Sequence, residues 1–195
     1  MIHAYHLILG AYGFWLPNDP RGSWSDFVGA WNLLRFGSTT KTCERRPVAL
    51  DERDVAFYAA AKKALKYPAV HFTGLQARAI ARGFATFAAT SELRVYTCAI
   101  LPEHIHLVIG RHRYKVEQIA NLLKGAATRQ LNEEGIHPLR RFKTRSGRCP
   151  NAFSRGEWKV FIDSEPHLRN AIAYVENNPI REGLRPQRWR FVVPL

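Results

Sequence analysis

The sequence has no feature of a membrane-spanning or secreted protein. None of its apolar runs reaches the roughly 18 residues that a transmembrane helix requires. Its start, MIHAYHLILGAYGFW, has neither a basic segment nor a long apolar one, so we expect no signal peptide. Internal repeats and low-complexity tracts are also absent. Together with a content of 46% hydrophobic residues, these absences favour a globular protein of the cytoplasm.

Cysteine and acidic residues are both scarce. The three cysteines, Cys43, Cys98 and Cys149, are odd in number and form no CxxC pair, so we expect neither a disulfide framework nor a cysteine zinc site. Only 16 Asp and Glu stand against 29 Lys and Arg, which gives a net charge of +13. This excess favours a polyanionic partner, with nucleic acid as the first expectation and an acidic membrane surface as the second.

The residues that are present predict an α+β protein with a single domain over residues 1–195. We expect strands at 4–12, 93–100, 104–110 and about 157–162. We expect helices at about 51–66, 74–90 and 115–133, and a last helix that starts at Asp163 and ends at Pro179. This order predicts a ferredoxin-like split βαβ fold, in which an antiparallel sheet carries helices on one face and a further helix follows at the C-terminus.

An irregular stretch at about 13–50 interrupts this pattern. It contains FWLPNDPRGSW, in which turn-forming residues alternate with aromatic ones. A loop this long within a compact domain is usually functional or mobile. Two roles are open for it: a flap that contacts DNA, or a small satellite core built on Trp15, Trp24 and Trp31.

Two histidines lie one residue apart in LPEHIHLVIG, residues 101–110. Because residues i and i+2 of a strand point to the same face, His104 and His106 project together, while Ile105 and Leu107 face a core. Two imidazoles on one face can supply two ligands to a metal ion, and a third ligand must then come from elsewhere. The alternative is a pair of structural histidines bonded to backbone or water, so the motif needs a second element to become informative.

The segment AIAYVENNPIREGL, residues 171–184, offers that second element. Tyr174 and Asn178 are four residues apart and share one face of a helix. A tyrosine hydroxyl can act as a covalent nucleophile, and the oxygen of an asparagine amide can bind a hard metal ion. Each residue also has an ordinary interpretation, Tyr174 as a surface tyrosine and Asn178 as a helix cap, and the following proline biases Asn178 away from helical geometry.

The combination resembles a known family. LRVYTCAILPEHIHLVIG, followed by SRGEWKVFIDSEPHLRNAIAYVENNPIREGL, is similar to the REP-associated tyrosine transposases, which are IS200-like enzymes of the single-tyrosine branch of the His-hydrophobic-His nucleases. AYHLILGAYGFWLPNDPRGSW also resembles the N-terminal strand and loop of some members, whereas residues 40–90 show no convincing similarity. One departure is Glu103, where the family commonly has Asn; its carboxylate could join a metal site or simply lie in the turn.

This resemblance implies a function for each residue of the two motifs. It implies Mg²⁺ or Mn²⁺ bound by His104 and His106, with Asn178 as the third ligand, and Tyr174 as the nucleophile on single-stranded DNA. The product would be a 5′-phosphotyrosine and a free 3′-hydroxyl, made on short imperfect palindromes that fold into hairpins. We therefore expect REP-like DNA hairpins as partners, a nucleoid-associated location without a membrane, and a monomer or a homodimer.

A basic and aromatic segment at 139–159 is the candidate DNA surface. Phosphates are bound by Lys and Arg, and unpaired bases stack on aromatic or guanidinium planes. The candidate contacts are Arg21, Arg140, Arg141, Lys143, Arg145, Arg148, Arg155, Lys159 and Trp158. A solvated surface without a partner is the alternative for such a charged segment.

Three functions compete at this point. The first is a metal-dependent, tyrosine-mediated nuclease that transfers DNA strands. The second is a DNA- or RNA-binding protein that keeps the fold without the chemistry. The third is a metal-dependent hydrolase that uses water as its nucleophile.

Overall fold

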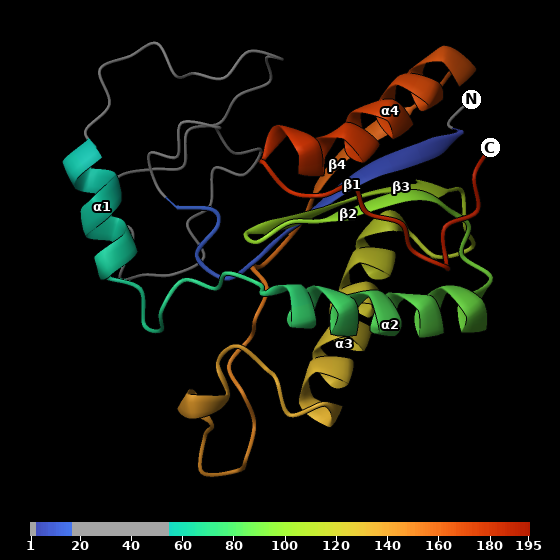
Figure 1. Cartoon of the computed structure of the whole chain (residues 1–195). Coiled ribbons are helices and arrows are strands. Elements are labelled where there is room, and N and C mark those ends of the chain that lie inside the picture. Colours follow the sequence, from blue (N-terminus) through green and yellow to red (C-terminus); the bar gives the residue numbers. More distant parts are fainter. Residues whose placement is uncertain (1–2, 17–54) are drawn as a thin grey trace.

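The structure, a computed structural model, describes residues 3–16 and 55–195 (Figure 1). The elements along the chain are β1 (Ala4–Gly10), α1 (Val55–Lys63), α2 (Gly74–Ser91), β2 (Val95–Ile100), β3 (His104–Gly110), α3 (Val116–Glu133), β4 (Trp158–Ile162) and α4 (Glu165–Arg181), with a short 3-10 turn at Arg140–Phe142 between α3 and β4. Within the described residues, no helix has the length and apolar character that a membrane crossing requires.

The four strands form one antiparallel sheet in the order β2-β3-β1-β4. β2 and β3 are a hairpin, closed by a bond from the Leu101 amide to the His104 carbonyl oxygen at 2.9 Å. β1 lies between β3 and β4, so the first strand of the chain is central, and the chain crosses over the sheet to reach its edges. This is the strand order of a ferredoxin-like split βαβ fold, and it confirms the α+β architecture expected from the sequence.

One face of the sheet is covered by α2 and α3 (Figure 1). Alternate residues of the central strands, such as Leu7 on β1 and Leu107 on β3, are fully buried against Phe84 of α2 and Leu123 of α3. The two helices pack closely at Gly83, where a Cβ atom would lie only 2.6 Å from the Ala126 carbonyl oxygen. Burial of these apolar side chains supplies the main driving force for the fold.

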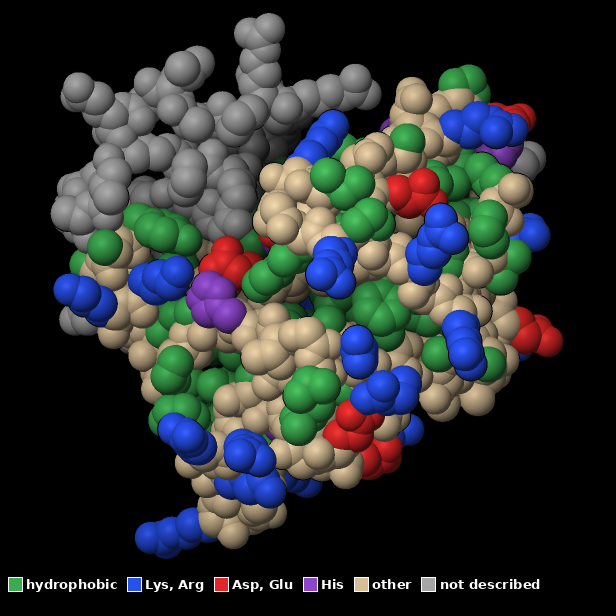
Figure 2. All heavy atoms as spheres, viewed as in Figure 1, with side chains coloured by type: hydrophobic (Ala, Val, Ile, Leu, Met, Phe, Trp, Pro, Cys, Tyr) green, Lys and Arg blue, Asp and Glu red, His purple; other side chains and the backbone are tan. Residues whose placement is uncertain are grey.

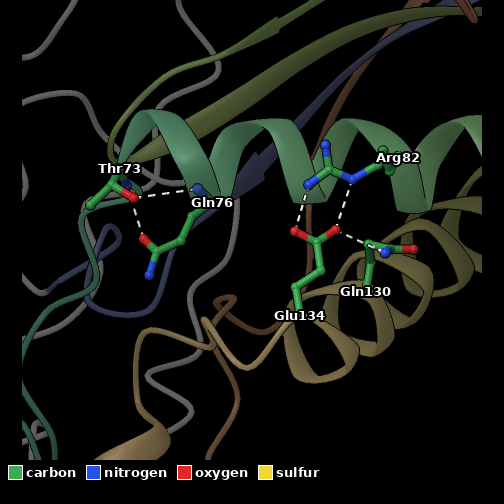
Figure 3. A network of polar contacts seen from close by, with 5 residues as sticks. All are labelled: Thr73, Gln76, Arg82, Gln130 and Glu134. Atoms are coloured by element: carbon green, nitrogen blue, oxygen red, sulfur yellow. Dashed lines mark hydrogen bonds and ion pairs between the residues drawn. The ribbon is translucent and has the colours of Figure 1, made fainter.

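Polar contacts cap the start of α2 and join the middle of α2 to the end of α3 (Figure 3). The Thr73 hydroxyl accepts a bond from the Gln76 amide at 3.3 Å, and the Gln76 side chain accepts one from the Thr73 amide at 2.9 Å. This reciprocal cap gives partners to two backbone N–H groups that have none within the helix, and so it defines where α2 begins. Further along, Arg82 binds Glu134 through two contacts at 2.7 and 2.5 Å, and Gln130 donates to the same carboxylate at 2.9 Å.

Among the described helices, α4 is the one that covers the opposite face of the sheet (Figure 1). Leu168, Ala171 and Val175 of α4 pack against a smaller apolar cluster of the sheet that includes Val108 and Ile162. Alternation along β3 therefore sends Ile105 and Leu107 to the α2–α3 core and sends His104, His106 and Val108 towards α4. The sheet thus separates a large structural core from the face that carries the histidines.

The end of α4 differs from the sequence prediction. The helix does not stop at Pro179 but continues through it to Arg181, and Asn178 is helical. Pro179 has no amide hydrogen to donate to the Val175 carbonyl oxygen, yet Val175 and Pro179 are both buried, and packing outweighs the lost bond. Two hydrogen bonds close the last turn. The Glu182 amide donates to the Asn178 carbonyl oxygen at 3.1 Å, and the Leu184 amide donates to the Pro179 carbonyl oxygen at 2.8 Å.

The start of the chain is described only in part. α1 is described from Val55 and ends at Lys63, slightly earlier than expected, whereas its predicted cap at Asp51 lies outside the described residues. Most of the irregular stretch at 13–50, with Trp24, Trp31 and Arg21, also lies outside the described residues. Cys98 and Cys149 are free thiols, as expected for a fold without a disulfide framework.

The C-terminal tail covers the β2 edge of the sheet. The Gln187 side chain accepts from the Ile100 amide and donates to the Ile100 carbonyl oxygen, both at 2.8 Å, as a neighbouring strand would. Further along, the Val193 amide donates to the Val95 carbonyl oxygen at 2.8 Å. An exposed strand edge invites pairing with other chains, and the tail blocks it on this side.

Candidate active site

Three histidines, not two, lie on the face that α4 covers. In the β1–β3 register, Ile8 pairs with His106 and Gly10 with His104, so the even-numbered residues of both strands share one face. His6 of β1 therefore joins the two histidines of β3. The sequence analysis missed His6, although the alternation of AYHLILG, with Leu7 and Leu9 turned towards the core, contained the signal.

The His6 and His106 side chains are joined directly. His6 Nε2 lies 2.9 Å from His106 Nδ1, and their rings stack with centroids 5.1 Å apart and planes inclined by 30°. The rings of His104 and His106 meet edge to face, with centroids 4.8 Å apart. His106 is 3% exposed, and its environment leaves it little freedom to reorient.

Tyr174 of α4 lies over this cluster. Its ring centroid is 5.8 Å from that of His6 and 5.8 Å from that of His106, and both contacts are edge to face. The tyrosine is nevertheless 43% exposed, so a large substrate can reach it. The Arg181 guanidinium lies 5.4 Å from the centroid of the same ring, at the end of the helix. The structure thus brings together the two motifs that the sequence analysis paired.

Asn178 and Glu182 continue the line of Tyr174 along α4, at steps of four residues. Asn178 is buried, and its Nδ2 atom has no hydrogen-bond partner within the described residues. Glu182, which caps the helix, places Oε1 3.7 Å from His104 Nε2. Tyr174 and Glu182 thus both contact histidines of the sheet, and Asn178 lies between them on the same helical stripe.

Burial keeps His6 and His106 neutral. Desolvation, reinforced by the nearby His167, lowers the pKa of His6 to about 4. Desolvation also holds the pKa of His106 well below its usual value, with further contributions from His6 and His104. Neutral imidazole is the form of histidine that binds metal ions.

The donor set fits a divalent ion. The part of the chain that the structure describes contains no group of three or more His, Cys, Asp or Glu side chains already arranged around a metal position. Two imidazoles and one amide form a different set, and a buried amide atom without a partner is a costly group that a ligand can satisfy. Rotation about its last bond lets Asn178 present oxygen in place of nitrogen.

An aromatic row extends from the histidines towards β4. Phe14 stacks on His104 with centroids 4.7 Å apart, Trp15 meets Phe14 edge to face at 4.6 Å, and Trp158 stacks on Trp15 at 5.8 Å. Gly10 makes this row possible, because a Cβ atom there would lie 2.8 Å from Phe14. Trp158, one of the predicted nucleic-acid contacts, is therefore connected to the histidines through this aromatic row.

The basic loop within 139–159 lies away from the face that carries the histidines. Figure 1 shows the loop around the 3-10 turn projecting past α3, away from α4. There Arg140 donates to the Gly135 carbonyl oxygen at 2.8 Å, and a turn between Thr144 and Arg148 orders the tip. Lys159 instead forms an ion pair with Glu117 of α3.

Basic side chains are spread widely over the molecule. On the face seen in Figure 2, Lys and Arg outnumber Asp and Glu over the described surface, including the protruding loop. Arg141, Lys143, Arg145 and Arg155 are exposed. Glu103 lies apart from the site, since its carboxylate is 3.5 Å from His71 and 4.0 Å from Lys62, which agrees with the turn interpretation.

Known proteins similar to this chain include a transposase family and two solved structures. Residues 64–178, more than half of the chain, match the model of a family described as "Transposase IS200 like". No match to a curated protein was found. Among solved structures, the chain is similar to a REP-associated tyrosine transposase bound to a REP hairpin, with 9% identity over 94% of this chain and 70% of that one, and a TM-score of 0.48. It is also similar to a candidate transposase from Deinococcus radiodurans R1, with 16% identity over 89% and 88% of the two chains, and a TM-score of 0.38.

Proposed function

This chain belongs to the IS200-like transposase family, and we propose that it is a REP-associated tyrosine transposase that cuts and rejoins single-stranded DNA. The observation that carries the proposal is the contact of the Tyr174 ring with both His6 and His106 in one site. A phenol that is 43% exposed, lying beside neutral imidazoles, combines a nucleophile with a place for a cation.

The reaction follows from the chemistry of the phenol. The Tyr174 hydroxyl gives up its proton to solvent, its oxygen forms a bond to phosphorus, and the bond from phosphorus to the 3′ oxygen of the preceding nucleotide breaks. That oxygen takes up a proton and leaves as a free 3′-hydroxyl, while Tyr174 retains the 5′-phosphate. The new ester keeps the energy of the phosphodiester, so a 3′-hydroxyl can later attack it, restore the DNA bond and release the tyrosine without ATP.

His104, His106 and Asn178 are the residues that would hold the ion. Bound Mg²⁺ or Mn²⁺ would draw charge from the phosphate and favour attack on it. The chain's own contribution is to keep the His106 imidazole neutral by burial, to hold Asn178 on the same helical stripe as Tyr174, and to place Arg181 over the phenol. The Arg181 guanidinium is suited to the charge of a phosphate approaching that ring.

The DNA hairpin is bound in part by the protruding basic loop. Its arginines and Lys143 are suited to phosphate contacts, which fix the position of a duplex without reading its sequence. Since this loop lies away from α4, we assign it to the hairpin stem and assign the single strand to the face of Tyr174. Trp158, stacked on Trp15 in the aromatic row that leads to the histidines, is the candidate stacking platform for that strand.

An adduct assay tests the proposal. Hairpin DNA with single-stranded flanks is incubated with the protein and Mn²⁺, and adducts that resist denaturant are separated on a gel. We expect the adduct to carry a label placed at the 3′ end of the DNA, and Tyr174→Phe to abolish it. Tyr114→Phe is a matched control, because Tyr114 also lies beside a histidine and under an arginine.

Two results would favour the competing functions. Cutting without an adduct, at an unchanged rate in Tyr174→Phe, indicates a hydrolase that uses water. Hairpin binding without any cutting by the wild type indicates a binding protein that keeps the fold, a function that the net charge of +13 alone would support.

A further inference from the structure

The bond between His6 and His106 has a direction that matters for the site. His6 Nε2 and His106 Nδ1 are 2.9 Å apart, so one nitrogen donates its proton and the other accepts it. If His6 donates, His106 carries its own proton on Nε2 and has no lone pair to offer an ion. If His106 donates from Nδ1, its Nε2 lone pair is available as a ligand.

His6 also supports the nucleophile. Its ring stacks on His106 and meets the ring of Tyr174 edge to face, so one side chain contacts both the candidate ligand and the phenol. It comes from β1, the central strand that is paired on both sides, which makes it a rigid support. Residues that fix the orientation of a histidine ligand contribute strongly to metal affinity in other proteins.

We propose that His6 is a positioning residue: it accepts the Nδ1 proton of His106, thereby turning Nε2 of His106 towards the ion, and it supports the ring of Tyr174. The role in catalysis rests on the proposed function, but the effect on His106 does not. If His6 had a purely structural role, the position of an acceptor atom on its side chain would not affect His106.

Two amide variants separate these roles. The side-chain amide of Gln reaches about as far as Nε2 of histidine, whereas that of Asn reaches only about as far as Nδ1. His6→Gln therefore keeps an acceptor near His106, and His6→Asn does not. Both variants are polar and smaller than histidine, so differences in general packing are limited, and thermal unfolding of each one shows whether it folds.

The experiment reads His106 directly, without DNA. Long-range proton–nitrogen NMR spectra of the ¹⁵N-histidine-labelled, metal-free protein report which nitrogen of His106 carries the proton. Titration with Mn²⁺, followed by electron paramagnetic resonance, reports affinity. We expect the Nδ1-protonated form in the wild type, affinity reduced by about 10- to 100-fold in His6→Asn, and most of it recovered in His6→Gln.

The proposal is overturned if His106 carries its proton on Nε2 in the wild type, if the wild type binds no Mn²⁺, or if a folded His6→Asn binds Mn²⁺ as tightly as the wild type. The same holds if His6→Gln and His6→Asn lose the same affinity. These readings are independent of the adduct assay, so a protein that binds Mn²⁺ as expected but forms no adduct contradicts the proposed function and leaves the role of His6 in place.

Discussion

The ring of Tyr174 on the last helix lies 5.8 Å, centroid to centroid, from the ring of His106 on β3. α4 brings the tyrosine there because Leu168, Ala171 and Val175 on the same helix pack onto the sheet next to the histidines. The helix is thus both a structural layer and the carrier of the proposed nucleophile. Its apolar contacts place the phenol, and its polar stripe faces the site.

Removal of either histidine of β3 should separate cutting from binding. In His104→Ala or His106→Ala the proposed ion loses a ligand. Loss of a residue that only orients a metal ligand typically lowers activity by about 10- to 100-fold, so adduct formation should fall by at least that factor. Hairpin affinity, measured by fluorescence anisotropy, should change by less than about threefold, because phosphate contacts come from other residues. An equal loss of binding and cutting would make these histidines structural.

Neutralising the protruding loop should weaken binding in a salt-dependent way. In the double variant Arg145→Ala with Arg148→Ala, two phosphate contacts are lost, so the slope of log affinity against log salt should decrease by roughly two. Arg78→Ala with Arg129→Ala, in α2 and α3, is the control with the same change in charge. If the two double variants bind a hairpin equally well across the salt range, the loop is a solvated surface.

The buried histidines should make stability depend on pH in the metal-free protein. The pKa of His6 is about 4 in the folded state, below its usual value of 6.5, so between these values the unfolded chain takes up the proton first. The free energy of unfolding should therefore decrease as the pH falls from about 6.5 to about 4, by roughly 3 kcal/mol from His6 alone. His106, with its pKa shifted in the same direction, adds to the loss.

Urea unfolding at several pH values with a chelator present measures this effect. His6→Gln should flatten the dependence, whereas His3→Gln, at an exposed histidine, should leave it unchanged. If the free energy of unfolding of His6→Gln depends on pH as steeply as that of the wild type, protonation of His6 does not destabilise the folded protein.

The close approach of α2 and α3 gives a test of the fold itself. Gly83→Ala places a methyl group 2.6 Å from the Ala126 carbonyl oxygen and should reduce the free energy of unfolding by about 1–3 kcal/mol. Gly125→Ala, in α3 with no atom near its would-be Cβ, should instead increase it by roughly 0.5–1 kcal/mol, because alanine favours helices. A stabilised Gly83→Ala would contradict the packing described here.

Local rules explain why much of this could be predicted from the sequence. The alternation of His104 and His106 with Ile105 and Leu107 placed the histidines on the face away from the core, because a strand has no other way to bury its apolar residues. The four-residue step from Tyr174 to Asn178 placed both on one helical stripe for a similar reason. The strand order followed from the succession of elements and the known constraints on crossovers.

The errors come from contacts between distant parts of the chain. Pro179 should end a helix by its local chemistry, but burial against the sheet outweighs one missing hydrogen bond. Gln187 gave no local sign that it would pair with Ile100 along the strand edge. The basic segment at 139–159 was predicted to be a DNA surface, and no local pattern indicated that the loop within it would project to the other side of the sheet from α4.

The most direct test of the central claim is mass spectrometry of the protein–DNA adduct. After reaction with a hairpin substrate and Mn²⁺, the adduct is digested with nuclease and protease, and the peptide that contains Tyr174 is sequenced. The account predicts a nucleotide phosphate attached to Tyr174, with its 5′ position in the linkage, and an unmodified Tyr174 when His106 is replaced by alanine. A phosphate attached to any other residue, or cut DNA with no modified peptide, would contradict it.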